Sequence, residues 1–540
     1  VATKREAPES NTRYAQGGST ITQKLVKNYF LNSERTIKRK FIEFFMSLIL
    51  EAHSSKDEIL ETYLNVIYLG QNGPFQIRGY PAASEYYFEK PIQSLEIHEC
   101  ALLAAVLNSP GLYDPFRKQE SSLKRRNLVL DKMSEYGFIR ANEAELAKNS
   151  SLPKKNLVNV SETAPYYIDA VRKEMTALSI PLEGATIFTG LDLQSQLAAQ
   201  SSVRNQLAKL ETDNKQIKKI KESGKSLEAV LISVNNQTGI IESIVGGRGF
   251  RLTQYNRAIQ GHRQVGSIMK PLVFLTALEQ TMSPTKILDD TRFKYEYQKQ
   301  SWSPENYNNK YFGEVPMYFA LKNSLNCATA KLGIEVGLDK IIQTARSAGI
   351  ESHLESVPSL TLGAFELYPF EVVQTYLTIA NLGQKKNLRL IRSVVNQFGG
   401  ELYRSQSSIT DAFDKIATAQ LVSMLKQTIL SGSARLITLS GYDHPAAGKT
   451  GTTSDNKDSW FAGFTPQITT VVWVGYDDNT PHGLTGSSGA VPIWLQYMKL
   501  RTAQYPKIDF EWPPETELRT YHHEPDEVSK DVQLLFRVNR

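Results

Sequence analysis

The sequence predicts a multi-domain protein in which an all-α N-terminal domain precedes an α/β (α+β) domain built on an antiparallel sheet. The chain has 540 residues, which is too long for one compact domain. Residues 17–150 repeat apolar side chains at three- and four-residue spacing, as amphipathic helices do. Strand patterns stand at both ends of 229–500, with helical patterns between them. That order favours a sheet assembled from distant parts of the chain.

The helical pattern of the N-terminal region is clearest in a few segments, namely 19–31, 36–52, 56–69, 96–107 and 124–133. Two apolar stretches in them, FFMSLILEA and ALLAAVL, are shorter than the roughly 18 residues that span a bilayer. We therefore expect both stretches to be buried helix faces. Ser19, Ser33 and Ser55 are expected to cap the helices that they precede.

The other boundaries follow from changes in composition. Residues 151–228 combine a turn-rich stretch, a short strand pattern and a helical pattern, and we interpret them as a connecting module. The proline- and charge-rich tail, 501–540, is expected to be loosely packed. The predicted parts are thus 1–150, 151–228, 229–500 and 501–540.

Composition restricts the function only weakly. The net charge of +6 fits an anionic substrate or an anionic membrane surface, but no nucleic-acid recognition motif accompanies it, so we expect no nucleic-acid partner. The two cysteines, Cys100 and Cys327, lie far apart, and no Cys/His cluster has metal-ligand spacing. We therefore expect neither a structural metal nor a disulfide framework.

The first chemical signal is the stretch VGSIMKPLVFLTAL, which places Ser267 three residues before Lys270. A serine needs a nearby base to act as a nucleophile, and helix positions i and i+3 share a face. A lysine can be that base only if burial or neighbouring cations lower its pKa. The same spacing recurs at Ser121 and Lys124, so the spacing alone decides nothing.

Two further motifs follow in the order that serine acyl-transfer enzymes use. KNSLNCAT supplies Ser324 and Asn326, and AAGKTGTT supplies Lys449 on a predicted strand. A literal SDN at 454–456 is rejected, because it lies in a predicted hairpin turn directly after Lys449. Each motif alone has an ordinary explanation as a helix cap, a polar turn or a strand edge. Together, and in this order, they favour Ser267 as a nucleophile.

With these motifs, residues 229–500 resemble the transpeptidase domain of penicillin-binding proteins, whose fold is shared with serine β-lactamases. The resemblance implies that Ser267 attacks the D-Ala–D-Ala end of a peptidoglycan stem peptide, releases D-alanine and passes the acyl group to an amine. Lys270 would be the base, and Ser324, Asn326 and Lys449 would complete the network. No cofactor is implied, and β-lactams would bind covalently. Thr450 and Thr452 would bind the substrate carboxylate, with Gly451 between them allowing close approach. The N–H groups of Ser267 and Thr452 would form the oxyanion hole.

The helical region carries polar residues that suit a phosphate. A Gly-Gly turn precedes a helix whose first turns hold Ser19, Thr20, Gln23, Lys27 and Asn28, and free N–H groups there can bind anions. In the next helix, Arg39 and Glu43 lie together at i,i+4 spacing, opposite the apolar side. The alternatives are a soluble polar face and a surface ion pair.

These segments resemble the glycosyltransferase domain of bifunctional (class A) penicillin-binding proteins, of the penicillin-binding protein 1b type. The resemblance implies a lysozyme-like fold that polymerises lipid II into nascent peptidoglycan, with divalent metal (Mg) as a possible cofactor. Glu43 would be the second acidic residue of that site. The implied ligands of donor phosphates and sugars are Ser19, Thr20, Gln23, Lys27, Asn28, Arg39 and Lys40.

Three departures from the family pattern concern the glycosyltransferase. The family's first block, which carries the catalytic base, is not found in this sequence, where only 16 residues precede Gly17. Lys24 replaces a usual glutamine, and Asn108 replaces a usual lysine. The alternative function is therefore a transpeptidase or D,D-carboxypeptidase with an inactive, lipid II-binding helical domain. A β-lactamase is a further alternative that the attached helical domain disfavours.

The implied substrate sets the expected location. We expect a single-pass protein of the bacterial cytoplasmic (inner) membrane, with its catalytic domains on the periplasmic or extracellular side. The chain starts at Val1, and no apolar run in it is long enough to span a bilayer, so the membrane anchor is expected to lie outside this sequence. Envelope regulators are possible partners.

Overall fold

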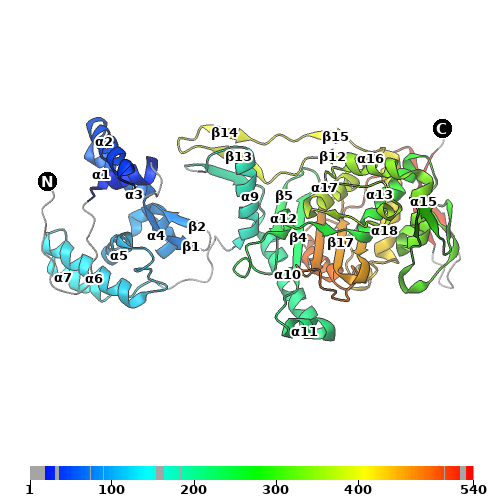
Figure 1. Ribbon diagram of the computed structural model, residues 1–540, viewed down its shortest axis with the longest axis horizontal. Helices are drawn as coiled ribbons and strands as arrows, with labels where there is room; N and C mark the ends of the chain where they lie inside the picture. The colour runs from blue at the N-terminus through cyan, green and yellow to red at the C-terminus, as the bar shows by residue number, and fades with distance from the viewer. Residues whose placement is uncertain are drawn as a thin grey trace. The chain divides into compact units, whose positions relative to one another are not determined.

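The chain folds into two compact units, Val1–Ser161 and Glu162–Arg540 (Figure 1). We analysed a computed structural model of the protein. The structure describes residues 19–30, 36–72, 75–88, 90–153, 163–182, 184–503, 505–522 and 531–538.

The first unit is mainly helical, as predicted. Its elements are, in chain order, α1 (Ile21–Phe30), α2 (Ile37–His53), α3 (Lys56–Val66), β1 (Tyr68–Asn72), β2 (Phe75–Arg78), α4 (Tyr80–Phe88), η1 (Ile92–Ser94), α5 (Ile97–Asn108), α6 (Gln119–Glu135) and α7 (Ala141–Lys148). The antiparallel hairpin of β1 and β2 was not predicted, since the helix expected over 56–69 included the start of β1. Ser55 caps α3 through a reciprocal pair with Glu58, which confirms one predicted cap. Thr36 caps α2, and Ser33 lies outside the described residues.

The core of the first unit is centred on α5. Leu102, Leu103 and Val106 are buried there against side chains of α1, α3 and α4. The stretch ALLAAVL is therefore a buried helix face, as expected.

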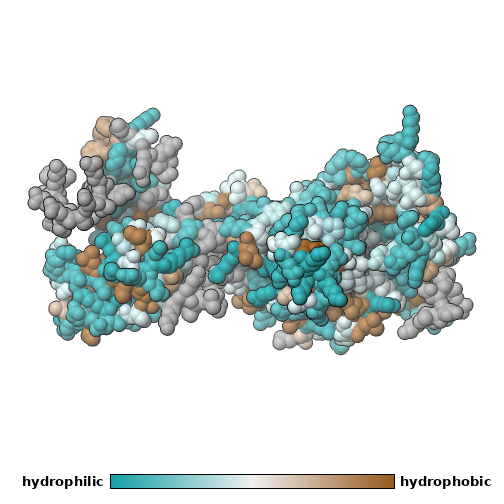
Figure 2. Space-filling view, turned by 60° about the horizontal axis from the view of Figure 1, so that its bottom comes forward, coloured by the Kyte–Doolittle hydropathy of each residue, from teal (hydrophilic) through white to brown (hydrophobic). Residues whose placement is uncertain are grey.

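The apolar face of α2 lies on the surface of the first unit, so our prediction that FFMSLILEA is buried is wrong. Its large apolar side chains are 47–66 % exposed, namely Phe41, Phe44, Phe45, Leu48 and Ile49. The buried residues of the helix include two polar ones, Glu43 and Ser47. Apolar atoms accordingly gather on the surface at the α2 end of the first unit (Figure 2). Among the described residues, no helix is long and apolar enough to cross a membrane.

The second unit is built on a five-stranded antiparallel sheet in the order β16-β17-β18-β4-β5. Its strands are β4 (Glu228–Asn235), β5 (Ile241–Val245), β16 (Ala447–Thr452), β17 (Asp458–Phe464) and β18 (Ile468–Gly475). The hairpin of β4 and β5 joins the C-terminal strands through β18, where Val230 lies opposite Trp473. The predicted sheet of sequence-distant strands is confirmed.

The other elements of the second unit surround this sheet. They are α9 (Pro165–Ala177), β3 (Thr186–Thr189), α10 (Leu193–Asp213), α11 (Lys215–Glu222), α12 (Arg257–Gln260), β6 (Arg263–Gln264), η2 (Gly266–Met269), α13 (Lys270–Glu279), β7 (Ile287–Asp290), β8 (Tyr295–Tyr297), β9 (Gln300–Trp302), η3 (Tyr307–Asn309), β10 (Gly313–Pro316), α14 (Met317–Asn323), α15 (Asn326–Val336), α16 (Leu338–Ala348), η4 (Pro358–Leu362), β11 (Glu366–Leu367), α17 (Pro369–Ala380), β12 (Gln384–Lys386), β13 (Ile391–Val395), β14 (Glu401–Arg404), β15 (Ile409–Asp411), α18 (Lys415–Leu430), α19 (Leu436–Leu439), η5 (Ser454–Asn456), α20 (Ala490–Thr502), β19 (Thr516–Tyr521) and β20 (Val532–Arg537).

Helices cover both faces of the sheet, which gives three layers. Leu231 on β4 faces a core that includes α10 and α20, whereas its neighbours Val230 and Ile232 face a second core that includes α13, α17 and α18. Because both faces are buried, two of the inner strands carry continuous apolar runs instead of alternating with polar residues, namely AVLI in β4 and VVWV in β18.

Two segments pack more closely than their sequences indicated. Most of 151–228, interpreted as a connecting module, lies in the second unit, where α10 buries Val203 and Leu207 beside α20. In the tail, β19 and β20 form a hairpin against α18, and Leu535 N–H donates to Ser423 Oγ at 3.2 Å. Both segments have too few apolar residues to mark a core by composition. Their partners are supplied by distant parts of the chain.

Leu207→Ala tests whether α10 belongs to the core of the second unit. Removing this fully buried side chain should lower the free energy of unfolding by about 2–5 kcal/mol. Thermal denaturation followed by circular dichroism measures the change. Leu197→Ala is the matched control, because Leu197 is exposed on the same helix and should change stability by no more than about 0.5 kcal/mol. Equal effects of the two substitutions would contradict this packing.

Candidate active site

An open cleft of about 760 Å³ in the second unit is lined by residues from all three predicted motifs. These residues are Ser267, Ser324, Asn326, Thr450 and Thr452. The structure therefore brings together segments that are up to 185 positions apart in the sequence (452 − 267). The rejected SDN, 454–456, forms the turn η5 between β16 and β17 and lines the same cleft. Lys124, the lysine of the second pair with this spacing, lies on the surface of α6, where it pairs with Glu120, and it does not line this cleft.

Ser267 is held in a short turn, η2, that is fixed by backbone contacts. Gly266 N–H donates to Gly363 O at 3.0 Å, and Val265 N–H donates to Phe365 O at 3.1 Å. Gly266 has a φ of +55°, and a Cβ at this position would lie 2.6 Å from Thr452 O. Only glycine fits here, which explains why the nucleophile follows a glycine. The turn is thereby pressed against the strand that carries the third motif.

Lys270 lies behind the cleft surface and is fully buried. Its Nζ donates to Ser324 O and to Asn326 Oδ1, both at 2.6 Å, and lies 3.3 Å from Ser324 Oγ. None of the hydrogen bonds among the described residues joins it to Ser267 Oγ. Burial, reinforced by the positive charge of Lys449, holds the pKa of Lys270 well below its usual value.

Ser324 bridges the two lysines. It ends α14 in the left-handed conformation, with φ 58° and ψ 38°, which turns its side chain toward both of them. Lys449 Nζ donates to Ser324 Oγ at 2.8 Å and to Thr450 O at 3.0 Å. Burial lowers the pKa of Lys449 to about 7. A single hydroxyl therefore connects two buried amines whose pKa values both lie below that of an exposed lysine.

The strand β16 forms the cleft wall opposite Ser324. Thr450 Oγ1 donates to Ser433 Oγ at 2.8 Å, and Thr452 Oγ1 accepts from Gly486 N–H at 3.0 Å. Gly451 between them is tightly packed, since a Cβ there would lie 2.7 Å from the Ile268 side chain. The two hydroxyls and the edge of the strand are thus available to a ligand in the cleft.

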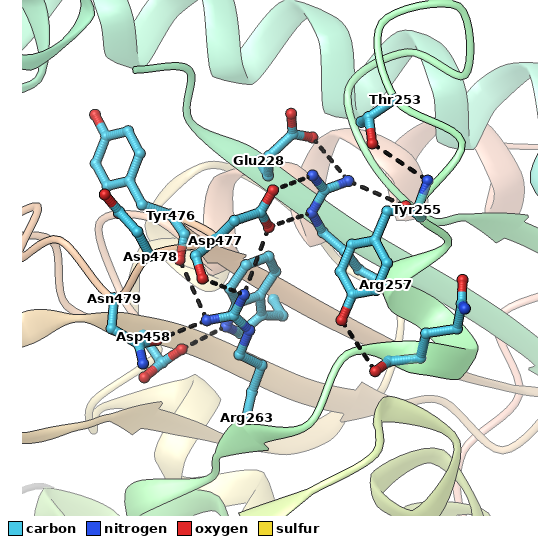
Figure 3. A network of polar contacts seen from close by, with 12 residues as sticks. Glu228, Thr253, Tyr255, Arg257, Arg263, Asp458, Tyr476, Asp477, Asp478 and Asn479 are labelled. Atoms are coloured by element: carbon cyan, nitrogen blue, oxygen red, sulfur yellow. Dashed lines mark hydrogen bonds and ion pairs between the residues drawn. The ribbon is translucent and has the colours of Figure 1, made fainter. Parts of the chain in front are cut away.

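Sequence reasoning missed the polar network that anchors the chain just before Ser267 (Figure 3). Arg257 Nε donates to Asp477 at 2.7 Å, and Arg257 also pairs with Glu228. Arg263 donates to Asn479 at 2.6 Å, and its guanidinium lies 5.0 Å from the centre of the Trp473 ring. These residues fasten 257–264 to the ends of β4 and β18. No motif marks them, because Asp477 and Asn479 lie more than 200 positions away from the arginines that they bind.

In the first unit, the predicted pair on α2 is present and buried. Arg39 donates to Glu43 Oε2 at 2.8 Å, and Lys40 binds the other carboxylate oxygen. Lys40 also donates to Ser19 Oγ at 2.8 Å, which brings the starts of the two helices together. The Glu43 side chain is only 1 % exposed, so this is not the surface ion pair of the alternative interpretation.

The start of α1 differs from its prediction in one respect. Thr20, and not Ser19, caps the helix, since Gln23 N–H donates to Thr20 Oγ1 and Thr20 N–H donates to Gln23 Oε1, each at 3.2 Å. Lys27 is exposed on the same helix. The side chain of Asn28 and the Gly-Gly turn at 17–18 lie outside the described residues.

Comparisons with known proteins agree with these two sites. Residues 3–134 match the family model described as Transglycosylase, and residues 229–499 match the model described as Penicillin binding protein transpeptidase domain. The Aquifex aeolicus protein named Penicillin-binding protein 1A is 34 % identical over 93 % of this chain and 79 % of its own length.

Two proteins named Penicillin-binding protein 1B are also similar. The Vibrio cholerae protein is 38 % identical over 93 % of this chain, and the Escherichia coli protein is 36 % identical over 91 %. The chain spans less than two thirds of their lengths, 64 % and 58 %. The crystal structure of Penicillin-Binding Protein 1A from Haemophilus influenzae has a TM-score of 0.72 and 20 % identity, covering 96 % of this chain and 94 % of that one. That likeness confirms the fold class.

Proposed function

The chain belongs to the bifunctional class A penicillin-binding proteins, and on that premise we propose that it polymerises lipid II into glycan strands and cross-links their stem peptides. The observation that carries the second activity is the cluster of Lys270, Ser324 and Lys449 beside Ser267. Burial disfavours the charged forms of both amines, which destabilises the fold. Buried amines with lowered pKa values are typical of catalytic sites.

In the proposed acylation, Ser267 Oγ attacks the carbonyl carbon of the penultimate D-alanine. Neutral Lys270 accepts the hydroxyl proton; its two N–H groups already bind Ser324 O and Asn326 Oδ1, which leaves the lone pair for that proton. The carbon–nitrogen bond then breaks, and the leaving D-alanine amine takes a proton from the Ser324 hydroxyl, which Lys449 replenishes. An amine of a second stem peptide attacks the resulting ester and gives up a proton to Lys449 through the Ser324 hydroxyl. The ester C–O bond breaks, and Ser267 Oγ takes back its proton from Lys270.

The same cleft offers groups for the rest of the substrate. The Thr450 and Thr452 hydroxyls would bind the terminal carboxylate, since both line the cleft. Lys449 is buried, so it would act on the carboxylate through the Ser324 hydroxyl and not by direct contact. The backbone N–H groups of Ser267 and Thr452 would stabilise the oxyanion.

In the proposed glycosyl transfer, Glu43 with Arg39 and Lys40 forms the charged part of the site. The two cations would stabilise the pyrophosphate of the lipid substrate, with Ser19 held beside Lys40. Gln23 is occupied in capping α1, which limits its proposed role to fixing the start of that helix. Within the described residues, no group of three or more His, Cys, Asp or Glu side chains could hold a metal.

The proposed location is the bacterial cytoplasmic membrane, with the catalytic units outside the cytoplasm and the anchor outside this sequence. The exposed apolar face of α2 supports contact with lipid, because such a patch is rare on a surface that meets only water. A lipid-linked substrate would reach the neighbouring Glu43 from that surface.

Ser267→Ala tests the nucleophile. Without the hydroxyl no ester can form, so covalent labelling by a fluorescent penicillin, read on a denaturing gel, should disappear. Ser121→Ala, which removes the serine of the second pair with this spacing, should label like the unmodified protein. Labelling that persists in Ser267→Ala would contradict the assignment.

Glu43→Gln tests the site on α2. Loss of the carboxylate leaves Arg39 and Lys40 without their buried counter-charge, and we expect glycan polymerisation to fall by about 10²-fold or more. Polymer made from labelled lipid II, in the presence of penicillin and divalent metal, is measured on a gel. Penicillin labelling should stay unchanged, and Glu61→Gln, at an exposed position on α3, is the control. Unchanged polymerisation would remove Glu43 from the site.

A further inference from the structure

A buried pair of polar side chains, Asp290 and Asn306, lies against the start of α15, the helix that begins with Asn326. Neither residue belongs to the three motifs. Asp290 ends strand β7, and Asn306 follows β9 by four positions. Both side chains are almost fully buried, and every hydrogen bond that they make can be traced.

The pair caps α15 from outside the helix. Asn306 Oδ1 accepts from Asn326 N–H at 2.7 Å and from Cys327 N–H at 3.0 Å, and Asp290 Oδ1 accepts from Ala328 N–H at 3.3 Å. The first N–H groups of a helix have no partner inside it, and the preceding residue here, Leu325, cannot cap them with its side chain. The cap is therefore supplied by residues 20–38 positions away.

The orientation of the Asn306 amide is fixed. Its Nδ2 donates to both carboxylate oxygens of Asp290, at 2.9 and 2.8 Å, and to Lys310 O at 2.9 Å. Asp290 Oδ2 in turn accepts from Phe312 N–H at 3.1 Å. If the amide were reversed, Oδ1 would face the Asp290 carboxylate, and Nδ2 would face the first N–H groups of α15. Only one arrangement satisfies the set.

The neighbouring residue holds the Asn326 side chain. Asn326 Nδ2 donates to Glu305 O at 2.7 Å, which directs Oδ1 toward Lys270 at 2.6 Å. Glu305 and Asn306 thus fix Asn326 by its side chain and by its backbone. The position of Lys270 depends on this placement, because Asn326 Oδ1 is one of its two closest acceptors.

We propose that Asn306 and Asp290 are positioning residues for the acylation of Ser267, acting through Asn326 on Lys270. Asn306 sets where the Asn326 amide lies. Asp290 holds Asn306 and also places a negative charge near the Lys270 amine. This inference rests on the proposed transpeptidase function and assigns a role within it.

Titratable groups on three elements face Lys270. Lys449 on β16 disfavours its protonated form and Asp290 on β7 favours it. Burial raises the pKa of the Cys327 thiol on α15 to about 11, so that group carries no charge near neutral pH. Loss of the Asp290 charge would therefore lower the pKa of Lys270 further, and the neutral amine would persist to lower pH. Loss of the Asn306 amide leaves these charges in place and changes only the geometry.

The experiment measures the rate constant of acylation by a fluorescent penicillin as a function of pH, together with the fraction labelled at saturation. Asn306→Ala should lower the rate constant by roughly 10²-fold at all pH values, since small misplacements of a catalytic group have effects of that size. Asp290→Asn should shift the acidic limb of the profile to lower pH. The fraction labelled should stay near that of the unmodified protein in both.

Two further variants separate positioning from general damage. Asn306→Asp sets two carboxylates against each other and should be the slowest single variant, whereas Asp290→Asn combined with Asn306→Asp restores one amide–carboxylate pair and should regain part of the rate. Asp289→Asn is the matched control. Asp289 precedes Asp290 in β7 and pairs with Lys331 of α15 at the surface. Its substitution should change the acylation rate constant by no more than about twofold and should not shift the acidic limb of the pH profile.

Unchanged rate constants and an unshifted profile in Asn306→Ala and Asp290→Asn would overturn the inference. So would a double variant no faster than Asn306→Asp. If Asn306→Ala does not fold, the rate constants of Asn306→Asp and of the double variant decide. Labelling that survives Ser267→Ala would instead overturn the proposed function, so the two failures are distinguishable.

Discussion

The second unit is organised around a buried pair of lysines that share one serine hydroxyl. Lys270 and Lys449 are both fully buried, and Ser324 Oγ lies within hydrogen-bond distance of each. Two ammonium groups cannot both be buried this close without strong repulsion and desolvation, so the site favours a state with one proton fewer. The fold therefore generates a neutral amine near Ser267 at neutral pH, which an exposed lysine does not provide.

The surrounding scaffold keeps this arrangement rigid. The glycine before Ser267 allows η2 to approach β16, the arginine network of Figure 3 fastens the preceding segment to β18, and a side-chain cap fixes the start of α15. Each of the three motifs is thus anchored by residues outside it. Pre-organisation of this kind lets reacting groups meet without further reordering.

The sequence predicted the parts of the protein that local patterns encode. Helices of the first unit, the sheet of distant strands and the meeting of Ser267, Ser324 and Thr452 follow from periodicity and from motif order. The exposed face of α2 could not be predicted, because an apolar stripe looks the same whether it meets a core or lipid. Asp290 and Arg257 were missed since their partners are remote in sequence.

The central claim is that Lys270 and Lys449 carry one proton fewer than two ordinary lysines. An NMR titration of protein labelled with ¹⁵N in its lysine side chains tests this directly, with Lys270→Arg and Lys449→Arg variants to assign the two signals. We expect Lys270 to lose its proton at a pH well below that of an exposed lysine and Lys449 to lose its proton near pH 7. If both amines stay charged up to about pH 10, as exposed lysines do, the account is contradicted.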